Sequence, residues 1–260
     1  MGRNLSARSG SDERDACVSG PIFYLKESEK ERILKLQSDG MRGELCETER
    51  VKMERGKYTK LPLITIAIAA VNIILFLVFD LFLFRKQDEI VYYMALNPVL
   101  VVEGKEYWRL ITSMFYHFGI DHLMCNMMML YVVGGMLEPF FGRVRFLFLY
   151  FATGLIADGA SILYNSVIRS DSGRFVFCAG ASGAVYGLTG AFIAAVLFRR
   201  KQLSVHEKRQ LLLAVFFLLF GSIFDTGVGH DAHFGGFFGG LIIGSIFCII
   251  RRKKQKTIQG

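Results

Sequence analysis

The feature that most constrains this chain is a series of apolar stretches, each long enough to cross a lipid bilayer. About 20 predominantly apolar residues are needed to span roughly 30 Å of hydrocarbon. We identify six such stretches, at residues 61–84, 122–141, 146–168, 176–198, 210–228 and 233–250. The mean hydropathy of +0.38 agrees with this reading. We therefore expect an all-α, polytopic membrane protein with six transmembrane helices.

Lys and Arg residues gather on one side of this six-span arrangement. They are dense in the segments 50–60, 143–145, 199–209 and 251–256 and sparser in the connections on the other side. Because Lys and Arg near span ends mark the cytoplasmic side, both termini are predicted to be cytoplasmic. The net charge of +8 is then a consequence of topology, and nucleic-acid binding is not expected, because the charges flank apolar spans.

The chain divides into three predicted regions: a polar cytoplasmic segment over residues 1–60, a six-helix core over 61–250 and a basic cytoplasmic tail over 251–260. Residues 1–20 are rich in Ser, Gly and charge and are predicted to be disordered. The rest of the first segment has the pattern of either a short amphipathic helix at the membrane face or a small domain.

Further features of the sequence limit where its segments can lie and which groups it can bind. The long connection 85–121 contains the only Trp, Trp108, and several aromatic residues, so we expect it to lie in the bilayer interface. The five Cys residues form no CxxC or Cys/His spacing typical of a metal site. We therefore predict no structural disulfide, metal or other cofactor. The polar first 60 residues also contain no signal peptide pattern.

Polar residues in three of the spans are the candidates for a functional site. His122 and Asn126 are four residues apart in the second span, Ser182 and Tyr186 are four apart in the fourth, and His233 opens the sixth. At roughly 1.5 Å per residue, Ser182 and His233 lie about 25 and 27 Å above the next cytoplasmic Arg, and His122 about 31 Å. Asn126, one turn below His122, therefore falls near the level of the other two.

Each of these residues alone has a simpler explanation. A membrane Ser commonly packs or bonds to its own helix, a His near a span end is commonly interfacial, and an Asn can bond a neighbouring helix. Polar groups in spans are costly, however, and normally face a protein interior or a water-filled cavity. Their common depth in three parallel spans favours one shared site.

Stripes of glycine indicate how two of these spans meet. The sixth span has Gly236, Gly240 and Gly244 at four-residue spacing, and the fourth has Gly183 and Gly187. Small residues at this spacing let two helix backbones approach closely. If the stripes face each other, Ser182 and His233 lie at the same end of the contact. A base within hydrogen-bond distance can then activate the serine hydroxyl.

Together these residues resemble the rhomboid intramembrane serine proteases, over about residues 61–250. The matching motifs are GxSG at Gly180–Gly183, HxxxN at His122 and Asn126, the glycine-spaced His233, Trp108-Arg109 in the first connection, and GGMLE with Gly134, Gly135 and Glu138. The resemblance implies the six-helix form common in bacteria and, with it, a location in the bacterial inner membrane.

The resemblance also implies roles for the site residues. Ser182 is the expected nucleophile and His233 the general base, without a carboxylate partner. His122, Asn126 and the Ser182 backbone N–H are expected to form the oxyanion hole, and Tyr186 to stack on the His233 ring. His117 is expected near the water path. Independently of the resemblance, Asp231 is a candidate for orienting a neighbour, because it lies two residues before His233.

The substrates implied are transmembrane helices of single-span proteins that partly unwind, and the Phe-rich span 210–228 resembles the mobile lateral gate of the family. Two other classes compete with this reading. A catalytically silent rhomboid-like protein that binds membrane clients usually lacks the Ser or the His, and both are present here. A transporter needs polar residues through the full depth of the membrane, whereas the lower halves of the second, fourth and sixth spans are almost wholly apolar.

Overall fold

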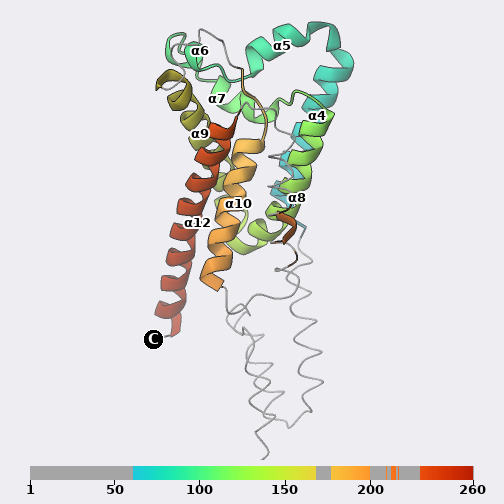
Figure 1. The fold of residues 1–260 in the computed structure, drawn as a ribbon. Helices are drawn as coiled ribbons and strands as arrows, with labels where there is room; N and C mark the ends of the chain where they lie inside the picture. Colours follow the sequence, from blue (N-terminus) through green and yellow to red (C-terminus); the bar gives the residue numbers. More distant parts are fainter. Residues whose placement is uncertain are drawn as a thin grey trace, which may run out of the picture. The chain divides into compact units, whose positions relative to one another are not determined.

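The computed structural model describes residues 61–167, 177–199, 209, 212–214, 216 and 229–259, and it is mainly helical. The main helices are α4 (Leu63–Leu77), α8 (Ile120–Phe141), α9 (Arg143–Val167), α10 (Ser182–Arg199) and α12 (His230–Gln259) (Figure 1). The structure forms no β-strand in these ranges; the one β-pairing there is an isolated antiparallel bridge between Leu96 and Cys178.

Four of the described helices are long and apolar enough to cross a membrane. They cover Leu63–Asp80, which includes a π-helical turn after α4, then α8, α9 and the His230–Lys253 part of α12. These match the predicted first, second, third and sixth spans to within a few residues, except that the first ends earlier. The predicted fifth span, 210–228, and the N-terminal region 1–60 lie outside the described residues apart from a few positions.

The predicted fourth span differs most from the structure. The sequence predicts a helix from residue 176, but α10 begins at Ser182, and residues 177–180 are non-helical. Two features hold these residues out of a helix. Cys178 pairs with Leu96 through two backbone hydrogen bonds of 2.8 and 2.9 Å, and Gly180 has a φ of +132°. The apolar run therefore predicts a helix that begins about six residues too early, at 176 and not at Ser182, because hydropathy does not report backbone conformation.

Helix α10 is the central helix of the described bundle. It contacts α8, α9 and α12, and nearly all of its residues from Gly183 to Val196 are buried or half-buried. By contrast, α4 exposes a broad apolar face, including Ile66 and Ile74, as expected of a helix that faces lipid. The small residues of α10 reflect this central position, since several neighbours must approach its axis closely.

Helices α10 and α12 meet backbone to backbone. A Cβ added to Gly240 would lie 1.7 Å from the carbonyl oxygen of Gly187, and one added to Gly236 would lie 2.1 Å from that of Gly183. Only glycine fits at these positions without a shift of the helices. The two glycine stripes therefore face each other along this contact.

The connection between the first two spans is folded. It contains α5 (Gln87–Met94), α6 (Pro98–Val102) and α7 (Arg109–Thr112), which lie beyond the upper end of α10 in Figure 1. Arg109 is fully buried and donates hydrogen bonds to the carbonyl oxygens of Tyr92 and Ala95, and it pairs with Glu106. A single guanidinium thus ties α5 to α7, while Trp108 beside it is half-exposed.

Glu138 joins the far end of α8 to the start of α4. Its buried carboxylate accepts hydrogen bonds from the backbone N–H groups of Ile64 and Thr65 at 3.1 and 2.8 Å, and from Thr65 Oγ1 at 2.9 Å. The first turn of a helix has N–H groups without intrahelical acceptors, and it favours negative charge. Gly134, one turn earlier in α8, leaves room for the Thr65 side chain.

We expect Glu138→Ala to destabilise the protein by about 2 kcal/mol or more, because buried N–H donors of α4 would lose a charged acceptor. Glu138→Gln should cost less, since its amide oxygen can still accept one of these bonds. Unfolding in mixed detergent micelles measures both. Glu89→Ala, which removes an exposed pair with Lys86, is the control and should be close to neutral. Equal stability of Glu138→Ala and Glu89→Ala would contradict this role.

The glycine contact generates a second prediction. Gly240→Ala should lower the unfolding free energy by about 2 kcal/mol, because the added methyl group forces α12 away from α10. The matched control is Gly159→Ala in α9, where an added Cβ meets nothing within 4 Å and alanine has the better helix propensity. Thermal unfolding in detergent should therefore move in opposite directions for the two variants. A Gly240→Ala variant as stable as the wild type would show that the helices do not touch here.

Candidate active site

Ser182 is the first residue of α10, and the residues before it are fixed by hydrogen bonds to the connection between the first two spans. Cys178 pairs with Leu96, the Gly180 N–H donates to the Ser113 carbonyl at 2.8 Å, and the Ala181 N–H donates to His117 Nε2 at 3.3 Å. The serine therefore extends from a helix end whose preceding backbone is held in three places. This arrangement fixes the backbone from which its hydroxyl projects.

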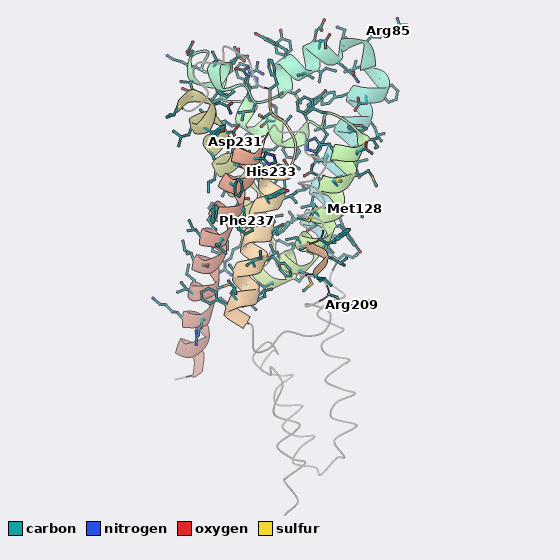
Figure 2. All side chains as sticks on the ribbon, in the orientation of Figure 1. Arg85, Met128, Arg209, Asp231, His233 and Phe237 are labelled. Atoms are coloured by element: carbon teal, nitrogen blue, oxygen red, sulfur yellow. The ribbon has the colours of Figure 1, made fainter. Side chains whose placement is uncertain are left out.

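His233 lies next to this serine. Its Nε2 is 2.9 Å from Ser182 Oγ, across the close contact of α12 with α10. Figure 2 labels Asp231, His233 and Phe237 in descending order along α12, with His233 in the upper part of the helix. An imidazole at this distance can accept the hydroxyl proton and so make the oxygen a nucleophile.

Tyr186 supports the imidazole from α10. The Tyr186 and His233 rings are stacked, with centroids 4.1 Å apart and an interplanar angle of 5°. Tyr186 lies one turn after Ser182, so the same helix that bears the hydroxyl also supports the ring. The stack restricts rotation of the imidazole and keeps one of its edges toward Ser182.

Gly180 brings a second histidine to the site. A Cβ on Gly180 would lie 2.6 and 2.7 Å from Cε1 and Nε2 of His122, and 3.6 Å from Ser182 Oγ. The His122 ring therefore lies directly against the Gly180 backbone, close to the serine. Both the φ of +132° and this contact require glycine at position 180.

His117 is a structural acceptor in this structure. Its Nε2 accepts the Ala181 N–H, so that nitrogen carries no proton. Burial and, secondarily, the nearby His122 lower the pKa of His117 to about 3. The ring is therefore neutral at physiological pH, and its ring centroid is 5.1 Å from that of His122. The prediction that it lies near a water path is not tested by these contacts.

The remaining predicted site groups have distinct positions. The buried Asn126 side chain turns back on α8 and donates from Nδ2 to the His122 carbonyl at 2.9 Å, which leaves its second N–H hydrogen for another acceptor. The Ser182 N–H belongs to the first turn of α10, where an intrahelical acceptor is lacking. Asp231 accepts a hydrogen bond from Asn165 of α9 at 3.3 Å.

Four polar residues of this region were not predicted from the sequence. Ser113 donates to Asp158 of α9, and Asn165 connects Ser161 to Asp231. Asp158 and Asn165 interrupt the predicted third span, and that interruption was the available signal. In the ranges that the structure describes, His, Cys, Asp and Glu form no group of three suited to a metal ion.

Comparison with known proteins identifies the family. The sequence of residues 104–250, which is more than half of the chain, matches the protein-family model described as the Rhomboid domain. YdcA of Bacillus subtilis (strain 168) is 29% identical over 156 residues, covering 60% of this chain and 74% of YdcA. The rhomboid protease GluP of the same strain is 29% identical over 195 residues, covering 75% of this chain and 36% of GluP.

Not every relative carries a protease name. The inactive RHOMBOID-like protein 8 of Arabidopsis thaliana is 30% identical over 141 residues, covering 53% of this chain and 37% of that protein. The matches to it and to GluP thus span little more than a third of those relatives. The family match agrees with the apolar helices described above. This chain is a multi-pass membrane protein and belongs to the rhomboid family.

Proposed function

We propose that this chain is an intramembrane serine endopeptidase that cleaves the transmembrane helices of single-span membrane proteins. The observation that carries the proposal is the 2.9 Å contact between Ser182 Oγ and His233 Nε2, with Tyr186 stacked on the imidazole. The protease name of GluP supports the same reaction class.

In the first step, His233 Nε2 accepts the hydroxyl proton as Ser182 Oγ attacks a peptide carbonyl carbon. The carbonyl oxygen becomes an oxyanion, and the bond to the leaving nitrogen then breaks as His233 donates the proton to that nitrogen. The product is an acyl ester on Ser182 and a free amine. Tyr186 keeps the imidazole oriented during both proton transfers.

The oxyanion needs donors that already point at it. The Ser182 N–H at the start of α10, the His122 ring against Gly180, and the second N–H hydrogen of Asn126 are our candidates for this role. A preorganised donor of this kind contributes about 2.7–4 kcal/mol to transition-state stabilisation. The four hydrogen bonds that hold residues 178–181 would keep the Ser182 N–H in place as the charge develops.

In the second step, water attacks the acyl ester, with His233 again moving the proton. Water must therefore enter the outer part of the membrane, where only protein-lined cavities tolerate it. The substrate helix must also unwind locally, because an intact helix keeps its carbonyl groups in intrahelical hydrogen bonds. We assign the gate for its entry to residues 210–228, on the resemblance given above.

The topology completes the proposal. We propose six spans over residues 61–250, with both termini cytoplasmic, a separate polar region over 1–60 and a basic tail over 251–260. The distribution of Lys and Arg supports this orientation. The bacterial inner membrane is the proposed location, and the relatives from Bacillus subtilis are consistent with a bacterial protein.

A catalytically silent client-binding protein is the alternative that the comparisons keep open, because one relative is named inactive. The serine–histidine contact favours the enzyme over this alternative, since a binding protein has no need of an activated hydroxyl. A transporter is disfavoured, because below the site α10 and α12 meet through glycine and not through a polar path.

A fluorophosphonate probe tests the proposed enzyme directly. The wild-type protein in detergent should take up one probe per chain, and Ser182→Ala and His233→Ala should lower the labelling rate by more than about a thousandfold. Cleavage of a single-span substrate in proteoliposomes should be lost in parallel. Activated serines react with such probes, whereas an ordinary hydroxyl is too weak a nucleophile.

Ser245→Ala is the matched control for this experiment. Ser245 also lies in a core helix, but its hydroxyl donates to the Leu241 carbonyl of its own helix at 2.7 Å. We expect this variant to be labelled like the wild type. A wild-type protein that is well folded but unlabelled would support the silent alternative, and labelling of Ser182→Ala would refute the assigned nucleophile.

A further inference from the structure

Asp158 is a carboxylate within a membrane-spanning helix that the proposed mechanism does not use. It lies in α9 and is only partly exposed, and its Oδ2 accepts a hydrogen bond from Ser113 Oγ at 3.2 Å. Ionisable groups in spans are expensive, and they commonly serve a function with an identifiable partner. Ser113, which is buried, is that partner.

A second contact fixes the same turn on the same helix. The 3₁₀ turn η4 (Ser113–Phe115) follows α7, and its buried Met114 fills the space beside Gly154 of α9. A Cβ on Gly154 would lie 2.2 Å from Met114 Cε. Gly154 and Asp158 are four residues apart on one face of α9, so η4 docks through an apolar contact and a polar one.

The docked turn is connected to the candidate active site through its backbone. The Ser113 carbonyl accepts the Gly180 N–H at 2.8 Å, and Gly180 lies against the His122 ring, two residues before Ser182. The Ser113 side chain is thus held by Asp158 while its carbonyl holds the segment that leads into the nucleophile. A chain of contacts from Asp158 through Ser113 to Gly180 therefore joins α9 to the proposed oxyanion donors.

The position of Asp158 along α9, level with Ser182, agrees with this chain of contacts. Its neighbour Ala157 would contact a Cβ placed on Gly183 at 2.5 Å and one placed on Gly236 at 3.4 Å. Gly183 directly follows Ser182 in the sequence. The carboxylate therefore lies at the same depth as the serine, where its hydrogen bond acts on the site and not on a remote part of the bundle.

We propose that Asp158 is a positioning residue for this active site, acting through Ser113 on Gly180 and so on His122 and the Ser182 N–H. The inference rests on the proposed serine endopeptidase function. Asp158 does not touch the reacting atoms. Its role is to supply an acceptor oxygen that fixes the η4 turn, and the conservative variant Asp158→Asn retains such an oxygen.

The test uses the full-length protein in detergent and a fluorophosphonate probe, with the maximal phosphonylation rate measured separately from the probe's apparent affinity. Asp158→Ala and Ser113→Ala should each lower the maximal rate about tenfold, because small displacements of oxyanion donors are costly, and leave the affinity within about twofold. The double variant should be no slower than the slower single variant, since both changes break one bond. Asp158→Asn should stay within about threefold of the wild type.

Asn72→Ala is the control for general destabilisation. Asn72 is a fully buried polar residue of α4 whose side chain donates to the Ile68 carbonyl of the same helix. At equal distance below its melting temperature, this variant should keep the wild-type rate. The inference is overturned if Asp158→Ala keeps that rate, if Asp158→Asn is as slow as Asp158→Ala, or if Asn72→Ala is equally slow.

Hydrogen–deuterium exchange provides a readout that does not depend on proteolysis. The Gly180 amide should exchange about tenfold faster in Asp158→Ala and Ser113→Ala than in the wild type, and Asn72→Ala should not change it. Unlabelled wild-type protein would refute the proposed function, and the exchange data would still decide the positioning role. Unchanged Gly180 exchange in Asp158→Ala would overturn the inference on its own.

Discussion

The backbone contact between α10 and α12 brings together the two residues at the centre of the candidate active site. The carbonyl oxygens of Gly183 and Gly187 occupy the space that side chains at Gly236 and Gly240 would need. In a bilayer, helices associate through close packing and not through a hydrophobic driving force, so glycine stripes are an effective way to join them. At the upper end of this contact, Ser182 Oγ and His233 Nε2 are 2.9 Å apart.

The second constraint is the accommodation of polar groups at membrane depth. Unpaired backbone groups in hydrocarbon cost several kcal/mol, so the non-helical residues before Ser182 need partners from outside their own segment. Their hydrogen-bond partners are Leu96, Ser113 and His117, all of which belong to the connection between the first two spans. That connection therefore helps to hold the candidate active site, which gives a physical reason for its folded, Arg109-centred structure.

The sequence predicts well those features that arise from local periodicity. The spans around α8, α9 and α12 follow from runs of apolar residues, and the facing of the two glycine stripes follows from four-residue spacing. The common level of Ser182 and His233, whose side chains are in contact, also follows from the nearly constant rise per residue in a helix, which places Asn126 near that level and His122 one turn higher. For Tyr186, spacing gives the correct helix face, but the stacking on His233 was expected only from the resemblance.

Features that depend on partners distant in the chain are not encoded in such patterns. The start of α10 at Ser182 is set by a bridge to Leu96, and the burial of Glu138 by the N–H groups of α4, more than 70 residues away. The bond between Ser113 and Asp158 likewise joins two elements whose proximity requires the whole fold. The Asn126 amide donates to the His122 carbonyl of its own helix. Residue spacing along a helix does not determine which acceptor such an amide takes.

The most direct test of this account is an experimental structure of the protein after reaction with a fluorophosphonate. We expect phosphorus bonded to Ser182 Oγ, the His233 ring still stacked on Tyr186, and the phosphoryl oxygen directed toward the Ser182 N–H and His122. A structure in which Ser182 and His233 lie on different faces of the bundle, or in which α10 and α12 are separated by side chains, would contradict it.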